Sequence, residues 1–518
     1  MNKKIGSALI SVFNKDGLEE IVKLLAKHNV KIISTGGTAE FIRKFGIKVT
    51  LVEEVTEYPS LFEGRVKTLH PKIAGSILKI RGNKIHEEEA KKYGIPEIDL
   101  VISNLYPFEK TLAKYAKEPA SAKASSGEEK IIEDIDIGGI SLIREASKNF
   151  KDVVVISSTD QYPKLKEILE KGNETTLEER KKFAGYGFEV TSKYDSAIRS
   201  YFQGVKLRYG ENPHQKGEFI GNLEESFVQL QGKELSYNNL IDTEAAIMTV
   251  SDFQDPAFAI IKHMNACGLA VRPEGKIFEA YKAAYKADPL SAFGGILAAN
   301  RPVGEDIAKL IKKQELFVEV IIAPDFSKEA LEIFKEKKNC RILKCLPAVL
   351  STQLMQAGKT PMFSSRQIRS CFNGLLIQDR DTQVEKESDL TTVTKRKPTK
   401  KEIGDMLVAS IATKHLKSNS IALVKNGALI SMGCGQTSRI DALKQAIDKA
   451  KKFKFSLKGA ALSSEAFFPF PDCVELAAKN GITAIIQPGG SKNDEASIKM
   501  ADKYKVAMAT TGFRHFKH

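Results

Sequence analysis

Short apolar runs alternate with amphipathic segments over residues 1–198. Residues 16–29 place Leu and Ile at helical spacing, and the stretch 38–46 is helical up to Gly46. Strand-length apolar runs lie between these segments, at 8–13, 30–35, 98–105 and 152–158. Alternating strands and helices predict a doubly wound α/β domain with a largely parallel sheet, which binds ligands at the carboxyl ends of its strands.

The rest of the chain continues with apolar, strand-length segments. They are 257–261, 294–300, 319–324, 374–381, 420–430 and 481–490. Because these are too many for one small sheet, we expect at least two further α/β layers. We place the domain boundary at residue 198, which gives domains 1–198 and 199–518. The polar segment 117–130 predicts a surface loop, since it is rich in Ala, Ser, Lys and Glu.

Composition narrows the classes of function. The chain has 518 residues, is 42% hydrophobic, and carries 79 Lys and Arg against 65 Asp and Glu, a net charge of +14. This charge suits an anionic partner, either nucleic acid or a phosphorylated metabolite. The lysines follow helical patterns, and the densest cluster, 394–402, has no interleaved aromatic residues, so we expect no nucleic-acid partner.

Other composition features concern the membrane, redox state and metals. No apolar run approaches the ~18 residues that a membrane helix needs, so we expect no membrane partner. The six cysteines are scattered without a Cys-x-x-Cys pair, which is typical of reduced thiols in the cytoplasm. No zinc-ligand spacing is present, so we expect no metal.

The segment "STGGT" (34–38) follows the second predicted strand. Gly37 lets the backbone approach an anion, Ser34 and Thr38 flank it, and Thr38 is placed to cap the next helix. Lys15 follows the first strand and would lie at the same sheet edge. A phosphate site and a plain strand-to-helix turn both explain this pattern.

Four further side chains lie near predicted strand or helix ends: Lys67, Tyr106, Asp136 and Lys148. Each has an ordinary explanation, such as a turn aspartate before two glycines or a lysine at a helix end. Together they supply an acid, a base and cations for a proton-transfer reaction.

The stretch "AFAIIKHMNACG" ends an apolar strand with Lys262 and His263 side by side. A cation and an imidazole are costly to desolvate unless something uses them. Both serve one cavity only if the strand ends or twists there, which Asn265 and Gly268 permit. The alternative is a surface lysine beside a core histidine.

Other candidate residues lie in polar or aromatic stretches of the second part. Asn426 starts an Asn-Gly hairpin turn before a Gly-rich segment. Arg208 and Tyr209 lie in a turn-rich stretch. Phe467 belongs to an aromatic run that would fill a core or wall a flat ligand. Arg514 is near the end of the chain, where we expect a frayed surface.

The motifs taken together resemble one known family, the bifunctional purine biosynthesis enzymes, which join phosphoribosylaminoimidazolecarboxamide formyltransferase to IMP cyclohydrolase. The resemblance covers nearly the whole chain, in order. The matching stretches are "SVFNKDGL", "STGGT", "GRVKTLHPKI", "NLYPFEKT", "IDIGG", "LRYGENPHQ", "KHMNACG", "DPLSAFGG", "LLIQDRD", "TKRKPT", "GCGQTSR", "SEAFFPFPD", "IQPGGS" and "RHFKH". The chain departs from the family pattern at Ala266, where proline is more usual, in the length of 117–130, and over 340–371.

The resemblance implies a fold, substrates and partners. The expected fold is an N-terminal methylglyoxal-synthase-like doubly wound sheet followed by two cytidine-deaminase-like α/β layers without the deaminase zinc. The expected co-substrates are a purine ribonucleotide and a reduced folate, 10-formyltetrahydrofolate, with no metal or prosthetic group. The family also implies a homodimer, with transferase sites that both subunits share.

The resemblance also implies residue roles in the transferase part. His263 would take the proton of the acceptor amine, and Lys262 would either stabilise the oxyanion or protonate the leaving folate nitrogen. Asn426 would orient the formyl oxygen. The residues implied to hold the nucleotide or the folate are Arg208, Tyr209, Phe467 and Arg514.

For cyclisation, the resemblance implies that Lys67 polarises the formyl oxygen and Asp136 accepts the carboxamide proton. Tyr106 and Lys148 would support ring closure. The implied phosphate cradle consists of Lys15, Ser34, Gly37 and Thr38. Three alternatives stay open: the same architecture with one working activity, a basic nucleic-acid-binding protein, and a ligand sensor.

Overall fold

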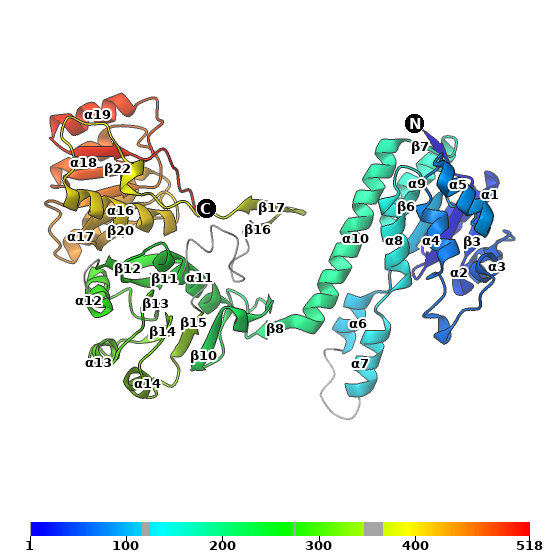
Figure 1. Cartoon of the computed structure of the whole chain (residues 1–518), viewed down its shortest axis with the longest axis horizontal. Helices are drawn as coiled ribbons and strands as arrows, with labels where there is room; N and C mark the ends of the chain where they lie inside the picture. The colour runs from blue at the N-terminus through cyan, green and yellow to red at the C-terminus, as the bar shows by residue number, and fades with distance from the viewer. Residues whose placement is uncertain (1, 116–123, 273–275, 347–365) are drawn as a thin grey trace. The chain divides into compact units, whose positions relative to one another are not determined.

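The computed structural model describes residues 2–115, 124–272, 276–346 and 366–518. The chain forms two compact units, Met1–Gly204 and Val205–His518 (Figure 1). The boundary predicted at residue 198 lies inside the last helix of the first unit, α10 (Leu177–Gln203). Within the described residues, no helix has the length and apolar character needed to cross a membrane.

The first unit contains a five-stranded sheet of order β4-β3-β2-β5-β6, and all its pairs are parallel. Its strands are β2 (Ser7–Val12), β3 (Lys31–Ser34), β4 (Thr50–Leu51), β5 (Leu100–Asn104) and β6 (Val154–Ile156). The order reverses between β2 and β5, which makes the sheet doubly wound, as predicted. A ligand is expected at the carboxyl ends of those two strands.

Helices surround this sheet and bury its apolar strands. They are α1 (Leu18–Lys27), α2 (Gly36–Arg43), α3 (Val52–Thr56), α4 (Pro71–Leu78), α5 (Lys84–Tyr93), α6 (Phe108–Tyr115), α7 (Ala124–Glu133), α8 (Gly138–Lys148), α9 (Tyr162–Glu170) and α10. A small antiparallel pair joins β1 (Lys3–Lys4) to β7 (Glu174–Thr175). The predicted loop 117–130 is partly wrong: 117–123 lies outside the described residues, whereas Ala124 onward is helical, because its Ala, Glu and Lys residues are good helix formers.

The second unit is built on one twelve-stranded sheet of order β10-β15-β14-β13-β11-β12-β20-β19-β21-β22-β23-β18. Its first six strands are β10 (Phe227–Gln231), β11 (Ala257–Lys262), β12 (Asn265–Val271), β13 (Gly295–Ala299), β14 (Val318–Ala323) and β15 (Arg341–Cys345). The other six are β18 (Thr391–Thr392), β19 (Ile421–Lys425), β20 (Ala428–Gly433), β21 (Ala461–Ser464), β22 (Ala484–Gln487) and β23 (Ala507–Thr510).

The two halves of this sheet repeat one layout. Along the chain, each half has an edge strand, a long helix, a hairpin, and then three parallel strands. Counted inward from its own edge, each half has the same strand order: β10-β15-β14-β13-β11-β12 in the first and β18-β23-β22-β21-β19-β20 in the second. The helices are α11 (Tyr237–Ser251), α12 (Ile277–Ala287), α13 (Glu305–Lys313) and α14 (Lys328–Phe334), then α16 (Lys400–His415), α17 (Arg439–Lys452), α18 (Asp472–Lys479) and α19 (Asp494–Lys503). The two halves belong to one sheet, because β12 pairs with β20 and joins them.

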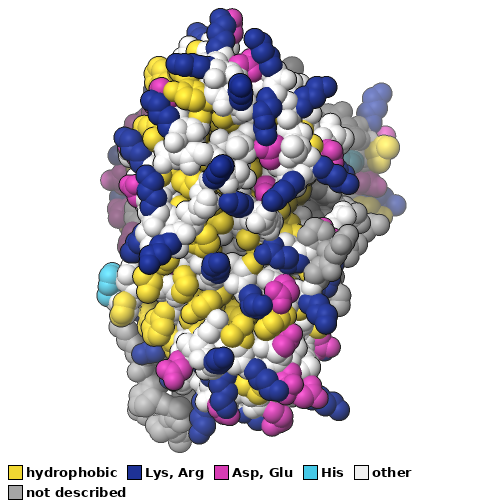
Figure 2. Space-filling model, turned by 90° about the vertical axis from the view of Figure 1, so that its left-hand side faces the viewer, with side chains coloured by type: hydrophobic (Ala, Val, Ile, Leu, Met, Phe, Trp, Pro, Cys, Tyr) yellow, Lys and Arg dark blue, Asp and Glu magenta, His cyan; other side chains and the backbone are white. Residues whose placement is uncertain are grey.

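Two small pairs of strands lie outside the large sheet. One joins β8 (Gly204–Leu207) to β9 (Gly217–Ile220), and the other joins β16 (Arg366–Cys371) to β17 (Gly374–Asp379). The segment 340–371 therefore contributes β15 and β16, and its middle, 347–365, lies outside the described residues. Figure 2 shows Lys and Arg side chains scattered over one face of the second unit among acidic and apolar side chains, as the helical lysine patterns predicted.

Candidate active sites

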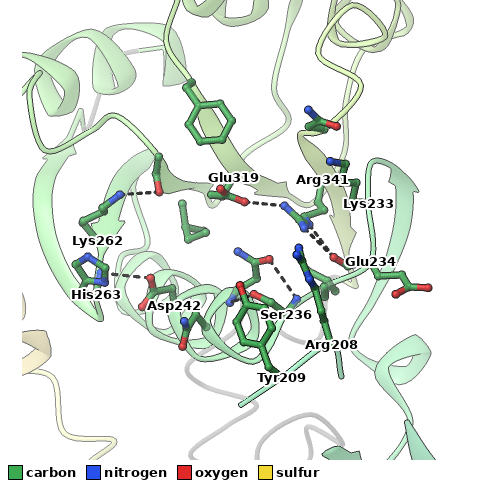
Figure 3. Close-up of a pocket in the computed structure, with 17 residues that line it drawn as sticks. Arg208, Tyr209, Lys233, Glu234, Ser236, Asp242, Lys262, His263, Glu319 and Arg341 are labelled. Atoms are coloured by element: carbon green, nitrogen blue, oxygen red, sulfur yellow. Dashed lines mark hydrogen bonds and ion pairs between the residues drawn. The ribbon is translucent and has the colours of Figure 1, made fainter. Parts of the chain in front are cut away.

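A cavity of about 680 Å³ lies in the second unit, at the amino ends of β13, β14 and β15 (Figure 3). Its walls come from α11, from the turn between β11 and β12, and from the segment before β9. The lining residues are Arg208, Tyr209, Lys233, Glu234, Leu235, Ser236, Asn238, Asn239, Asp242, Lys262, His263, Gly294, Ile296, Phe317, Glu319, Asn339 and Arg341. Four sequence-predicted residues, Lys262, His263, Arg208 and Tyr209, therefore share one hollow.

The turn that carries His263 is a tight hairpin. Lys262 pairs with Asn265, so His263 and Met264 are its two central residues, and both have positive φ, 51° and 63°. Two central residues with positive φ define the turn that matches the twist of a hairpin. The Asp242 carboxylate on α11 accepts the backbone N–H of His263 at 3.2 Å and that of Met264 at 2.7 Å. Burial raises the pKa of Asp242, and these two N–H groups oppose the rise.

The Lys262 amine is fixed by backbone oxygens. It donates to the carbonyl oxygens of Phe293 at 2.9 Å and of Gly294 at 3.0 Å. Gly294 has φ of 69°, and a Cβ on this residue would lie 2.9 Å from Lys262 Nζ. Glycine therefore favours this backbone conformation and leaves room for the amine.

The opposite wall of the cavity is rich in cations. Arg341 makes an ion pair with Glu319 at 2.6 Å, and its Nη2 donates to the carbonyl oxygen of Glu234 at 2.8 Å. The Arg208 guanidinium lies 5.4 Å from the centre of the Tyr209 ring. Arginine groups held in this way suit a phosphate or carboxylate ligand that also carries a flat ring.

The second half of the sheet repeats the turn at Asn426 and Gly427, whose φ angles are 54° and 65°. The hairpin predicted here is present. The Asp405 carboxylate accepts their N–H groups at 3.0 and 2.6 Å. However, Gly427 lies beside Val271, at the far end of β12 from His263. Seven strand residues separate the two turns, about 20 Å, so one chain does not bring Asn426 to His263.

Phe467 follows the carboxyl end of β21, and Arg514 follows that of β23. These strand ends lie on the side of the sheet where the His263 turn is found. Phe467 is 38% exposed, so it does not belong to the core, whereas its neighbour Phe468 is fully buried. Arg514 contacts the ring of Phe516 at 4.3 Å. The expectation of a frayed terminus is wrong, because His515 is buried between two carboxylates.

These carboxylates anchor the end of the chain. His515 Nδ1 lies 2.6 Å from Asp381 and its Nε2 lies 2.8 Å from Glu385. Burial lowers the pKa of His515, but the two carboxylates outweigh burial and raise it to about 9.

In the first unit, α2 begins at Gly36, directly after β3. A Cβ on Gly36 would lie 3.7 Å from Lys67 Nζ, and one on Gly37 would meet nothing within 4 Å. The unpaired N–H groups of the first helical turn and the Lys67 amine thus form a corner, the anion corner, whose donors and positive charge suit an anion. Lys15 follows β2 and is half-buried, and its amine donates to the carbonyl oxygen of Phe13 at 3.4 Å.

The hydroxyls of Ser34 and Thr38 do not point to a ligand. Ser34 donates to the carbonyl oxygen of Ile10 at 2.7 Å, and Thr38 donates to that of Val12 at 3.1 Å. Both residues are buried. The prediction that Thr38 caps the helix is wrong, since Thr35 is the N-cap and Thr38 lies within the first turn. Ser34 and Thr38 fix the loop against β2.

Asp136 lies next to Tyr106 at the start of α8. Burial raises the pKa of the Asp136 carboxyl, while the backbone N–H groups of Gly139 and Tyr106 oppose the rise. The distance from Gly139 N to Asp136 Oδ1 is 2.7 Å. Burial also raises the pKa of Tyr106, with a further contribution from Asp136. These two groups form a partly desolvated acid-base pair at the carboxyl end of β5.

Lys148 does not join this pair, which corrects the sequence prediction. It is the last residue of α8, whereas Asp136 precedes the first. Eleven residues of helix separate them, about 16 Å. The helix of a parallel crossover returns the chain to the amino edge of the sheet, so its last residue lies away from the ligand edge.

Sequence reasoning missed two residues that hold these sites. Asp242 lies in an ordinary polar stretch of α11, but a search for repeats would have matched it to Asp405, since each precedes its turn by 21 residues. Tyr194 on α10 accepts the N–H of Asp136 at 2.8 Å and donates to the carbonyl oxygen of Asp134 at 2.7 Å. No local motif marks Tyr194.

Among the described residues, no group of three or more His, Cys, Asp and Glu is arranged to hold a metal ion.

Comparisons with known proteins cover the whole chain. The family model described as "MGS-like domain" matches residues 17–141, and that described as "AICARFT/IMPCHase bienzyme" matches residues 146–449.

Curated relatives match from end to end. The chain is 49% identical to the bifunctional purine biosynthesis protein PurH of Bacteroides thetaiotaomicron, with 100% of this chain and 99% of that protein covered. It is 44% identical to the PurH protein of Bacillus cytotoxicus and 45% identical to that of Rhodospirillum rubrum, with 99% of each chain covered in both comparisons.

Proposed function

The chain belongs to the family of bifunctional purine biosynthesis proteins, and from this membership we propose which residues carry each of its two reactions. The enzyme transfers a formyl group from 10-formyltetrahydrofolate to the 5-amino group of 5-aminoimidazole-4-carboxamide ribonucleotide. It then closes the product to inosine monophosphate with loss of water. Formyl transfer is assigned to the cavity of the second unit and cyclisation to the first unit.

Formyl transfer needs a base, because the acceptor amine is delocalised into its ring and is a weak nucleophile. His263 takes the proton of this amine as the nitrogen attacks the formyl carbon. The Lys262 ammonium has three N–H donors, of which two bind the carbonyls of Phe293 and Gly294. The third stabilises the oxyanion of the tetrahedral intermediate. The protonated His263 then gives this proton to the folate nitrogen, which leaves as the oxyanion collapses and the new formamide forms.

Substrate binding uses the remaining walls of the cavity. Arg208 and Tyr209 hold the ribonucleotide, with the arginine on its phosphate and the ring against the base. Phe467 and Arg514 lie at the same sheet edge and are assigned to the folate and to the phosphate. The finding that carries this assignment is that Lys262, His263, Arg208 and Tyr209 line one cavity although 53 residues of sequence separate Tyr209 from Lys262.

Cyclisation is assigned to the anion corner of α2 and to Asp136. The N–H groups of the first turn of α2 hold the phosphate, with Lys15 nearby. Lys67 polarises the formyl oxygen, and Asp136 accepts a proton from the carboxamide nitrogen as it attacks the formyl carbon. The raised pKa of Asp136 makes it a better base than an exposed carboxylate. Tyr106 supports the loss of water.

Two variants separate the assignments. Lys262→Ala with His263→Ala should stop formyl transfer and spare cyclisation of the formylated ribonucleotide. Asp136→Asn should do the converse, so the formylated intermediate accumulates. Both substrates and inosine monophosphate are followed by chromatography. Full transferase activity in the first variant, or full cyclisation in the second, contradicts the assignment.

Asn426 orients the formyl oxygen only if a second subunit supplies it, because its turn lies at the other end of β12. A homodimer is supported by the apolar hairpin of β16 and β17, where Ile368, Phe372 and Leu375 are 63, 103 and 63% exposed. Mixed dimers of a His263→Ala chain and an Asn426→Ala chain should regain one intact site. A mixture with no activity above that of the separate variants contradicts shared sites.

The six unpaired cysteines support a cytoplasmic location.

Two similar α/β halves support the cytidine-deaminase-like description of the second unit. The parallel doubly wound sheet supports the methylglyoxal-synthase-like description of the first.

A further inference from the structure

We propose that Asp242 is a positioning residue for formyl transfer, which acts by holding the backbone of the turn that presents Lys262 and His263. The inference rests on the function proposed above. Asp242 is assigned no proton transfer and no bond to substrate. It fixes the two catalytic side chains through the main chain between them.

The turn is costly without such a contact. His263 and Met264 both adopt the left-handed conformation, which side chains with a Cβ rarely occupy because it brings the Cβ close to the backbone. Such strain persists only where neighbouring groups compensate it. The Asp242 carboxylate supplies two charge-assisted bonds, one to each N–H, at 3.2 and 2.7 Å. The side chain of Asn265 adds a third, from its amide to the carbonyl oxygen of His263 at 2.8 Å.

The repeated turn shows that this contact belongs to the framework of the fold. Asp405 on α16 holds Asn426 and Gly427 with the same two bonds, across the same sequence separations of 21 and 22 residues. Asn and Gly adopt positive φ at little cost. The first turn has His and Met at these positions, so it depends more strongly on its carboxylate.

Asp242 also lines the cavity, so a direct contact with the ligand is the competing explanation. Met264 distinguishes the two. It is 40% exposed and does not line the cavity. Met264→Gly gives the first turn the glycine that the second turn already has, and this change lowers the strain without adding a group that could replace a ligand contact.

The experiment compares Asp242→Ala, Met264→Gly and the double variant in the full-length enzyme. Asp242→Ala should lower kcat of formyl transfer about 100-fold, because a displacement of about 1 Å in a catalytic group has that effect. The KM of the ribonucleotide should change by less than about threefold. The double variant should recover to within about tenfold of the parent. Met264→Gly alone should match the parent, and cyclisation should be unchanged in all three.

Amide hydrogen exchange over 262–265 provides a readout that does not depend on activity. Asp242→Ala should accelerate exchange at His263 and Met264, and Asp242→Asn, which keeps one acceptor oxygen, should give an intermediate rate. If Asp242→Ala unfolds the unit, the test uses Asp242→Asn and its double variant with Met264→Gly. The same two quantities, amide exchange at the turn and kcat of formyl transfer, are then measured in these variants.

The inference is overturned if the alanine variant keeps its kcat, or if its kcat falls while exchange at the turn is unchanged and Met264→Gly restores nothing. The latter result would assign Asp242 to the ligand. Full transferase activity in a His263→Ala enzyme would contradict the proposed function of His263. The exchange measurement would then still test whether Asp242 holds the turn.

Discussion

The two halves of the twelve-stranded sheet have the same layout and differ in one turn. In both, a lysine ends the first hairpin strand, an aspartate holds the turn, and the lysine amine binds two backbone carbonyls. In the first half the turn starts with His263 beside a cavity, and in the second it starts with Asn426. The fold thus supplies one geometry twice, and the residue at the first turn position determines which chemistry each copy can perform.

The largest effect should come from a substitution that makes the first turn like the second. His263→Asn should fold well, because asparagine adopts positive φ more readily than histidine. It should lower kcat of formyl transfer about 1,000-fold, since an amide cannot accept the proton. Steady-state kinetics with both substrates measures the loss. A variant within tenfold of the parent would show that the imidazole is not the base.

The lysines offer a matched pair. Lys262→Met should lower formyl transfer about 100-fold through loss of oxyanion stabilisation. Lys425→Met removes the equivalent amine, which binds the carbonyls of Ser456 and Lys458 at 3.3 and 2.8 Å. It should cost about 1 kcal/mol of stability and leave kcat within about twofold. Equal losses of kcat in the two variants would contradict a special role for the first turn.

The C-terminal half adds a pH-dependent anchor. The pKa of His515 is raised from 6.5 to about 9 in the folded chain, so its stabilisation is complete below about pH 6.5 and is lost as pH rises to about 9. The shift corresponds to at most about 3 kcal/mol. The melting temperature of the second unit should fall as the pH rises from about 6.5 to about 9, and His515→Gln should remove this pH dependence. The same slope in the variant would assign it to other groups.

Gly294→Ala tests how tightly the Lys262 amine is placed. The added Cβ would lie 2.9 Å from Nζ and would also strain a residue with φ of 69°. We expect kcat of formyl transfer to fall about tenfold with cyclisation unchanged. The matched control is Gly459→Ala, at φ of 76° with nothing within 4 Å of the new Cβ, which should lower stability but not kcat. A larger loss of kcat in the control would refute the placement.

Local patterns predicted much of this molecule. Apolar runs predicted β2, β3, β5 and β6 of the first unit and β11, β13, β14, β19, β20 and β22 of the large sheet, but they missed β10, β15, β21 and β23. The run 374–381 forms β17, which lies outside that sheet. The Asn-Gly pair predicted the second hairpin, and the adjacent Lys262 and His263 marked the cavity. Local patterns did not show that β12 pairs with β20, because strand order depends on contacts between distant segments. Asp242 and Tyr194 were missed for the same reason, since each acts on a segment more than 20 residues away.

Lys148 shows the opposite failure, and Asn426 stays a prediction that needs a second subunit. Both residues matched a motif, but a motif does not give the end of the helix or strand on which a side chain lies. The direction of the α8 crossover takes Lys148 to the wrong edge of its sheet. The antiparallel pairing of β12 with β20 takes Asn426 about the length of a strand from His263 within one chain.

Formylation of the amine beside the His263 turn can be tested by a crystal structure of the full-length enzyme with bound 5-aminoimidazole-4-carboxamide ribonucleotide. We expect the 5-amino nitrogen within about 3.5 Å of the His263 imidazole, or one water away, with the phosphate at an arginine. A ribonucleotide bound in the second unit away from this cavity, with His263 facing only solvent, would contradict it.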